Sequence, residues 1–418
     1  MKRIKINNVI SFLIAFSMLF YALRGKYGAI VITIYMLLML PMLLKENFKI
    51  NVINILYGSY LIIFAVILHT IRSISFEPYL VIGYLAASLL LFNSNIKLYE
   101  NLWKCLQIIS LLEALGIYLQ KFLPQVYYLI MSVILPSSVV TSIKKRLLEG
   151  YYTGFTREVS YTMFLIAIGL GIYIFNVETQ EKFSKTIFRR KLAAILFLFG
   201  ALFLSGKRAT ILFSVMAIFI IQFLKSNDKL KILKYLAIGV MAILIIILTF
   251  PLWSKIPALK RMVELLGFIG QGDVSGLTNG RISIYRDAIT LWNSERIAGI
   301  GWGNFKYSTQ KTVWYAGFDV HNCYLQILCE TGIIGALLFY ILTLTSIFNF
   351  IRCINRTQKR DVNFYKLALL TGYIQLFFMM YSVTEPILYE YTDYIIYFIC
   401  INITGIILKN TKEKRYKI

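Results

Sequence analysis

The chain has 418 residues, of which 58% are hydrophobic and 15% are charged, and its mean hydropathy is +0.70. Soluble proteins carry charge on about a quarter of their residues, so this composition excludes a soluble globular domain and indicates a protein partly solvated by lipid. The net charge is +24. Because Lys and Arg stand between apolar stretches, this charge indicates membrane topology and anionic lipid rather than nucleic acid.

Continuous apolar stretches of about 15–22 residues predict membrane-spanning helices, whereas a transmembrane barrel would show shorter alternating segments. The expected fold class is an all-α polytopic membrane protein, with 1–418 forming a single integral membrane domain. Twelve spans are predicted: 9–23, 28–44, 52–69, 78–92, 102–123, 159–177, 192–205, 209–224, 235–252, 333–351, 364–383 and 393–408.

The distribution of Lys and Arg orients these spans. With the N-terminus inside, the inner segments hold 24 Lys and Arg residues, and the four short outer loops hold five. Cytoplasmic loops carry the excess of positive charge, so both termini are expected in the cytoplasm of a cell whose cytoplasmic membrane the chain crosses many times. The first apolar segment is interpreted as a span because no signal-peptide cleavage site follows it.

The outer loop 124–158 contains the apolar segment 126–140, which is short and includes Pro136. A further span there would place the later basic loops outside, so an interfacial or re-entrant piece is expected. At the end of this loop, Arg157 and Glu158 precede span six. They either pair with each other or with water, or belong to a basic cluster on the outer side.

Few residues offer metal or cofactor chemistry. The five cysteines show neither a disulfide framework nor metal-ligand spacing, and the two histidines, His69 and His321, exclude a His-rich metal site. We therefore expect no metal and no cofactor. Glu113 lies in the middle of span five and is a functional candidate, with helix packing or a hydrogen bond to a neighbouring span as the alternative.

Lys207 and Arg208 form a basic turn between spans seven and eight, on the side assigned to the outside. Two cations at this place oppose the positive-inside trend. Either an anionic partner on the outer face or a role as a membrane-end anchor explains them.

The segment 253–332, between spans nine and ten, is predicted to be a large extracytoplasmic loop that carries part of the active site. Loops of this length are functional or disordered, and the aromatic residues of this one argue against disorder. Within it, the turn Asn279-Gly280 precedes an amphipathic helix on the membrane face with Arg281 in its first turn. Its apolar positions are Tyr285, Ala288, Ile289 and Trp292.

An arginine beside helix N-terminal amides attracts phosphate, and contact with lipid headgroups alone is the open alternative for Arg281. The glycine-rich run 298–305 precedes no clear helix, so a dinucleotide site is rejected and a tight connection is expected.

His321 stands shortly before span ten. Four residues follow it at spacings that share one helix face, which predicts that His321 caps a packed interface at the water boundary. They are Leu325, Leu328, Gly332 and Gly335. A histidine at this place can exchange a proton near neutral pH, and an interfacial aromatic anchor is the alternative.

Four motifs taken together resemble the O-antigen ligase and Wzy polymerase family of the bacterial envelope, over about residues 200–340. They are SGKRAT entering a span, NGR before a Trp-bearing helix, GIGWGNF, and HNCYLQILCETGIIG entering the next span. The resemblance implies a fold similar to that of the C-type membrane glycosyltransferases. It also implies transfer of a glycan from undecaprenyl diphosphate to an acceptor hydroxyl on the outer leaflet, without a metal or a nucleotide.

The same resemblance implies roles for individual residues. Arg281 and Arg208 match positions proposed to hold the diphosphate, and His321 matches the histidine proposed to orient or deprotonate the acceptor. Substrate binding is further expected of Lys207, Arg157, Asn322 and Glu330. Lys207 departs from the pattern, because many relatives have Ser-Arg where this chain has Lys207-Arg208.

Several functions remain open at this point. A polymerase of repeat units for a capsule or O-antigen type of polysaccharide is favoured by the Ile, Lys and Asn-rich composition. A ligase that transfers the finished glycan to a lipid, protein or wall acceptor is the first alternative. A flippase for lipid-linked oligosaccharides, which would show polar residues near the midplane and repeat symmetry, and a non-catalytic scaffold follow. Expected partners are the undecaprenyl-diphosphate-linked oligosaccharide, the lipid bilayer, and a flippase and chain-length regulator of the same pathway, but no nucleic acid.

Overall fold

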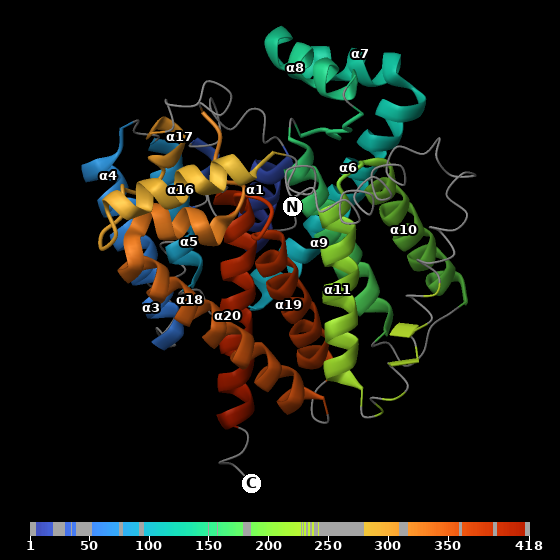
Figure 1. The fold of residues 1–418 in the computed structure, drawn as a ribbon. Coiled ribbons are helices and arrows are strands. Elements are labelled where there is room, and N and C mark those ends of the chain that lie inside the picture. The colour runs from blue at the N-terminus through green and yellow to red at the C-terminus, as the bar shows by residue number, and fades with distance from the viewer. Residues whose placement is uncertain are drawn as a thin grey trace. The chain divides into compact units, whose positions relative to one another are not determined.

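The computed structural model describes only part of the chain, and helices are the regular secondary structure of that part (Figure 1). The described residues are 6–19, 30–34, 36–38, 52–74, 78–91, 96–148, 150–156, 158–178, 185–226, 228, 230, 233–234, 236–237, 241, 280–308, 317–358, 362–387 and 391–413.

Five of the described helices are long and apolar enough to cross a membrane. They are Val52–Arg72, Ile96–Phe122, Arg208–Lys225, Cys323–Thr357 and Asp393–Thr411. The predicted class, an all-α membrane protein, is thus confirmed. The count of twelve spans stays a prediction, and most of the predicted span 235–252 lies outside the described residues.

The chain forms two compact units, and each is described by itself. The first comprises residues 1–106 and 281–418, and the second comprises residues 107–280. Helix α6 (Ile96–Phe122) contributes its first turns to the former and the rest to the latter.

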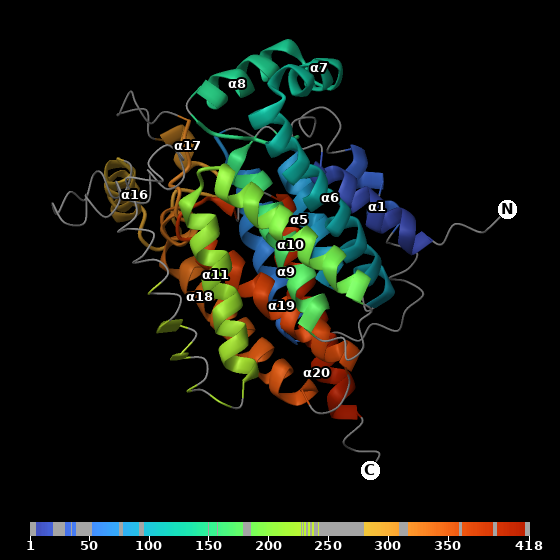
Figure 2. The same ribbon diagram turned by 90° about the vertical axis from the view of Figure 1, so that its right-hand side faces the viewer.

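The first unit packs around its last helix, α20 (Tyr391–Glu413), which contacts α5 (Pro78–Leu91) most extensively and also α3, α18 and α19. The helices α16 and α17 both contact α18 and lie near each other in both ribbon views (Figures 1 and 2). The other helices of this unit are α1 (Ile6–Leu19), α3 (Val52–Tyr60), η3 (Leu61–Leu68), α4 (His69–Arg72), α16 (Ile282–Ser294), α17 (Phe305–Ser308), α18 (Cys323–Thr357) and α19 (Val362–Tyr381).

Buried amides fasten α20 to its neighbours. Asn54 Nδ2 donates to Asn402 Oδ1 at 2.9 Å and to the Leu91 carbonyl at 2.8 Å. Asn402 Nδ2 donates to the Leu90 carbonyl at 2.9 Å and to the Tyr99 hydroxyl at 2.7 Å. Because apolar packing does not distinguish a neighbouring helix from lipid, interhelical hydrogen bonds of this kind fix which helices meet.

The second unit contains α7 (Pro124–Ile134), α8 (Ser137–Leu148), α9 (Val159–Glu178), α10 (Lys185–Leu204) and α11 (Arg208–Lys225) besides α6. Small residues permit close helix contact here. A Cβ on Gly169 would lie 2.0 Å from Ser110 Oγ, and one on Gly200 would lie 2.3 Å from the Tyr118 hydroxyl. Glycine is favoured at such places because it lets neighbouring helices approach closely.

The predicted piece 126–140 is two short helices that contact each other, α7 and α8, joined at Leu135 and Pro136. At a rise of about 1.5 Å per residue, neither helix is long enough to cross the hydrocarbon core. The Tyr127 hydroxyl on α7 donates to the carbonyl of Gly154, and burial raises its pKa.

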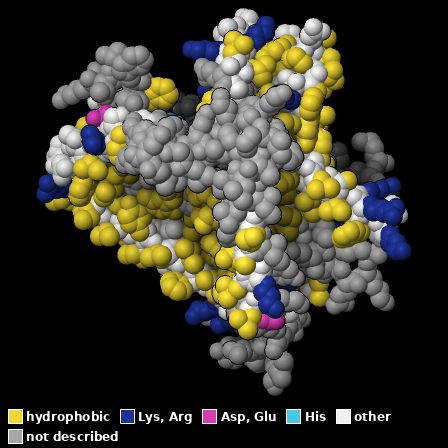
Figure 3. Space-filling view, turned by 45° about the vertical axis from the view of Figure 1, so that its right-hand side comes forward, with side chains coloured by type: hydrophobic (Ala, Val, Ile, Leu, Met, Phe, Trp, Pro, Cys, Tyr) yellow, Lys and Arg dark blue, Asp and Glu magenta, His cyan; other side chains and the backbone are white. Residues whose placement is uncertain are grey.

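Apolar side chains cover much of the described surface on the face that Figure 3 shows. On α18 they form a stripe after residue 332, which comprises Ile333, Ile334, Leu337, Leu338, Ile341, Leu344 and Phe348. Such a stripe suits contact with lipid and agrees with the predicted span 333–351.

Candidate functional site

Arg281 occupies the N-cap position of α16, where its side chain makes no capping hydrogen bond. Gly280, with φ 75°, forms the predicted turn before it, and Asn279 lies outside the described residues. The helix is amphipathic as expected, but its buried stripe differs from the predicted one: Ile284 is buried and Ile289 is 45% exposed. The buried stripe differs from the predicted one because α16 packs on α18. Its inner face comprises Ile284, Tyr285, Ala288, Leu291 and Trp292.

His321 lies outside the helix that follows it, which corrects the prediction that it shares a helix face with Leu325. Its backbone is in the left-handed region, with φ 56°. Among the described residues it is the one non-glycine residue with a positive φ. Asn322 then caps α18, since its side chain accepts a hydrogen bond from the Leu325 amide at 3.0 Å. A strained residue before a capped helix is held by its surroundings, and such strain is common at functional sites.

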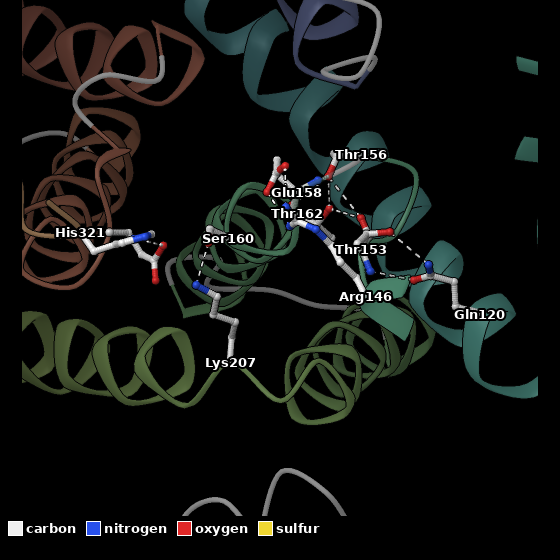
Figure 4. A network of polar contacts seen from close by, with 10 residues as sticks. Gln120, Arg146, Thr153, Thr156, Glu158, Ser160, Thr162, Lys207 and His321 are labelled. Carbon is white, nitrogen blue, oxygen red and sulfur yellow. Dashed lines mark hydrogen bonds and ion pairs between the residues drawn. The ribbon is translucent and has the colours of Figure 1, made fainter. Parts of the chain in front are cut away.

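The connection between α19 and α20 brings Arg281 and His321 to one place. Arg281 Nη1 donates to the Thr384 carbonyl at 2.7 Å, and its Nη2 lies 3.5 Å from Glu385 Oε1. His321 Nδ1 lies 3.9 Å from Glu385 Oε2 (Figure 4). The Glu385 side chain is 4% exposed, against 23% for Arg281 and 26% for His321. The basic groups therefore remain accessible above a buried carboxylate.

Glu330 is buried inside the first unit and holds the glycine-rich connection 298–305. Its Oε2 accepts from the Gly303 amide at 2.8 Å, and its Oε1 accepts from the Phe305 amide at 3.0 Å and from Gln326 Nε2 at 3.3 Å. Since these bonds occupy both oxygens, the visible role of Glu330 is to position this connection. The predicted role in substrate binding stays a prediction.

The connection 298–305 itself is tight, as the sequence predicts, and it fills a break in α18. Gly332 (φ 64°, ψ −170°) interrupts the helix, so the face predicted to run from His321 through Gly335 is not continuous. The amides of Ile300 and Gly301 donate to the Cys329 and Glu330 carbonyls at 3.1 and 2.9 Å. Carbonyls that lose their helical hydrogen bonds at the break thus accept hydrogen bonds from the connection. A membrane protein requires this, because lipid cannot supply such bonds.

Lys207 and Arg208 lie in the second unit. Gly206 has a φ of 74°, Lys207 is the N-cap residue of α11, and Arg208 is its first residue. Lys207 Nζ donates to Ser160 Oγ at the start of α9 at 2.7 Å (Figure 4). Two basic side chains thus stand at a helix N-terminus, where the backbone amides also favour anions.

Arg157 lies outside the described residues. Its neighbour Glu158 pairs with Arg146 on α8 through two bonds, of 2.6 and 3.0 Å (Figure 4). Glu158 thus has a bidentate partner 12 residues earlier, Arg146, which the sequence did not suggest. Whether Arg157 also pairs with Glu158 stays a prediction.

Glu113 supports a loop within the second unit. Its Oε2 accepts from the Phe155 amide at 2.9 Å. Seven residues later, Gln120 Oε1 accepts from the Thr153 amide at 2.8 Å (Figure 4) and from the Gly154 amide at 3.0 Å. Glu113 Oε2 also accepts from Thr162 Oγ1 on α9 at 3.4 Å, which supports the alternative of a hydrogen bond to a neighbouring span.

Two residues of these sites, Glu385 and Arg146, were not predicted from the sequence. The only signal for Glu385 was an acidic residue before a proline in a short outer loop free of Lys and Arg. Sequence spacing does not connect Glu385 to His321 or Arg281, which lie about 60 and about 100 positions earlier. Among the described residues, no three His, Cys, Asp or Glu side chains are grouped as a metal site.

Residues 193–340 match the family model described as O-antigen ligase, which confirms the resemblance over that part of the chain. The matched segment includes Lys207, Arg208, Arg281, His321 and Glu330. No curated protein matches the chain.

Proposed function

From the match of residues 193–340 to the O-antigen ligase family, we propose that this membrane protein is a glycosyltransferase of the bacterial envelope. Its donor is an oligosaccharide on undecaprenyl diphosphate, and the reaction takes place at the outer face of the cytoplasmic membrane. The preferred reaction is polymerisation of repeat units into a capsule or O-antigen type of polysaccharide.

The observation that carries the proposal is the meeting of Arg281 and His321 at Glu385. The two basic residues are 40 positions apart in the sequence, so the fold and not a shared helix brings them together. Both are partly exposed, so a substrate can reach them. A guanidinium suits the planar, bidentate recognition of phosphate oxygens, and an imidazole suits proton transfer near neutral pH.

The proposed step is a direct displacement. The acceptor hydroxyl oxygen forms a bond to the anomeric carbon of the donor while the bond from that carbon to the diphosphate oxygen breaks. The bonding electrons leave with the diphosphate, where Arg281 offsets the developing negative charge. His321 takes the hydroxyl proton as general base. Attack from the opposite side predicts inversion at the anomeric carbon, and NMR of the product linkage tests this.

No metal or nucleotide takes part in the proposed reaction. Arg281 supplies cationic charge at the leaving group, which a divalent ion supplies in other transferases. Lys207 and Arg208 stay predicted diphosphate-binding residues, and Asn322 and Arg157 stay predicted substrate-binding residues.

A ligase is the second candidate, because the matched family model carries that description. Both reactions use the same donor and the same displacement, and they differ in the acceptor. A flippase would need no proton-accepting group beside a phosphate-binding group, so the meeting of Arg281 and His321 favours a transferase.

Purified chain in lipid nanodiscs tests the proposal. The lipid-linked repeat unit of the host is supplied as both donor and acceptor, and products are followed by mass spectrometry. Longer lipid-linked glycans together with free undecaprenyl diphosphate support a polymerase. Products that form only after a host lipid or wall acceptor is added support a ligase. A folded chain that transfers nothing in either assay contradicts the proposal.

A further inference from the structure

Glu385 is a buried carboxylate whose two oxygens face two different basic residues. Oε1 lies 3.5 Å from Arg281 Nη2, and Oε2 lies 3.9 Å from His321 Nδ1. Burial of a carboxylate is costly unless opposite charge compensates it. The Glu385 side chain is only 4% exposed, and the two basic residues supply the opposite charge that compensates its burial.

The backbone around Glu385 is fastened to both basic segments. The Cys323 amide donates to the Ser382 carbonyl at 2.8 Å, and Cys323 Sγ donates to the Glu385 carbonyl at 3.2 Å. From the other side, Arg281 Nη1 donates to the Thr384 carbonyl at 2.7 Å. These bonds hold the carboxylate at a fixed place between segments that are far apart in the sequence.

We propose that Glu385 is a positioning residue that orients His321 and stabilises its protonated form during glycosyl transfer. This inference rests on the proposed function. Because Nδ1 faces Glu385, the opposite ring nitrogen, Nε2, takes the proton of the acceptor hydroxyl. A base oriented by a third group is the arrangement by which many enzymes activate a hydroxyl. The proton passes to water after the product leaves, and the lipid diphosphate keeps the electron pair of the broken bond.

The charges around His321 set the direction of the expected pH effect. Among the described residues, Glu385 from the α19–α20 connection faces both His321 and Arg281 of α16. Asp319 lies two residues before His321 in the chain, and its Oδ1 accepts from Gln326 Nε2 at 3.0 Å. The Glu385 charge favours imidazolium, and the Arg281 charge opposes it. Replacing Glu385 by a neutral residue removes the former and leaves the latter uncompensated. Both effects disfavour the imidazolium form of His321. The neutral imidazole that acts as base then persists to lower pH, and the acid limb of the activity profile moves to lower pH.

The test compares Glu385→Gln with the wild type in the nanodisc assay between pH 5 and 9. We expect kcat to fall about tenfold or more, with a smaller change in the donor KM, because proton transfer is impaired. We further expect the acid limb of kcat to shift down by about half a pH unit or more. Glu385→Asp keeps the charge and should hold the acid limb near its wild-type position.

Glu295→Gln serves as the matched control. It removes one carboxylate from the exposed end of α16 in the same unit and should leave the profile unchanged. If Glu385→Gln lowers the rate at every pH without moving the acid limb, or leaves the rate unchanged, the positioning role is wrong while the proposed function stands. If the folded wild type transfers no glycan, the proposed function is contradicted and this inference falls with it.

Discussion

Arg281 reaches the α19–α20 connection through two contacts of different kinds, a hydrogen bond to the Thr384 carbonyl and an ion pair with Glu385. A planar guanidinium can keep these contacts and still present N–H groups to a diphosphate. A lysine ammonium at the same position would have the charge but only a single nitrogen.

The loss of transfer rate should therefore depend on which residue replaces Arg281. Arg281→Ala should lower the transfer rate by about 100-fold or more, since it removes the charge at the leaving group. Arg281→Lys should recover part of that loss. Initial rates with the lipid-linked donor measure both effects. Arg286→Ala, on the exposed face of the same helix, is the control and should keep the wild-type rate. Equal rates for Arg281→Ala and Arg286→Ala would remove Arg281 from the reaction.

Asn322 has a visible structural role and a predicted functional one, and substitution separates them. As the N-cap of α18 it bonds the Leu325 amide, and Asn322→Ala should cost about 1 kcal/mol of stability. Asn322→Ser keeps a capping oxygen and should restore thermal stability in detergent. If Asn322→Ser is as stable as the wild type yet loses transfer activity, the predicted role in substrate binding gains support. If it is stable and fully active, capping is the whole role.

Helix α18 is broken where the sequence predicted an uninterrupted face. The spacing of Leu325, Leu328, Gly332 and Gly335 fits a helix, and periodicity does not report a break. At the break, the connection 298–305 donates two amides to carbonyls of α18. Tertiary contacts of this kind are invisible to local patterns.

Two glycines offer a matched test of this break. Both have left-handed backbones, φ 64° at Gly332 and φ 86° at Gly317. A Cβ on Gly332 would lie 2.2 Å from the Ile297 carbonyl oxygen, whereas one on Gly317 meets nothing within 4 Å. Gly332→Ala should therefore lower the melting temperature and the yield of folded protein much more than Gly317→Ala does. Similar losses in both variants would mean that backbone strain alone, and not the docked connection, accounts for Gly332.

At the scale of the whole molecule, the sequence predicted the all-α membrane class and placed most described helices, because long apolar segments leave few alternatives. It also selected Arg281 and His321 through motif resemblance. It missed Glu385 and Arg146, because the contacts of Arg146 and Glu385 join segments between 12 and about 100 residues apart. The left-handed backbone of His321 likewise depends on its surroundings and not on its spacing.

The predicted topology can be tested by cysteine labelling. Of the five cysteines, four are buried and Cys105 is partly buried, so Cys105→Ser should give a background with little reactivity. Glu295→Cys lies in the predicted outer loop, and Asn355→Cys lies in the predicted inner segment 352–363. Both positions are exposed. An impermeant maleimide should label Glu295→Cys in intact cells and Asn355→Cys only after permeabilisation. The reverse pattern would overturn the positive-inside assignment.

The central claim is that this chain transfers lipid-linked glycans through Arg281 and His321. The most direct measurement is the surface polysaccharide of a deletion strain, separated on a gel and complemented with the wild type, Arg281→Ala or His321→Ala. We predict that deletion reduces the ladder to single repeat units, and that only the wild type restores it. Full-length chains retained on the lipid carrier would identify a ligase instead. An unchanged ladder after deletion, or full restoration by both variants, would contradict the account.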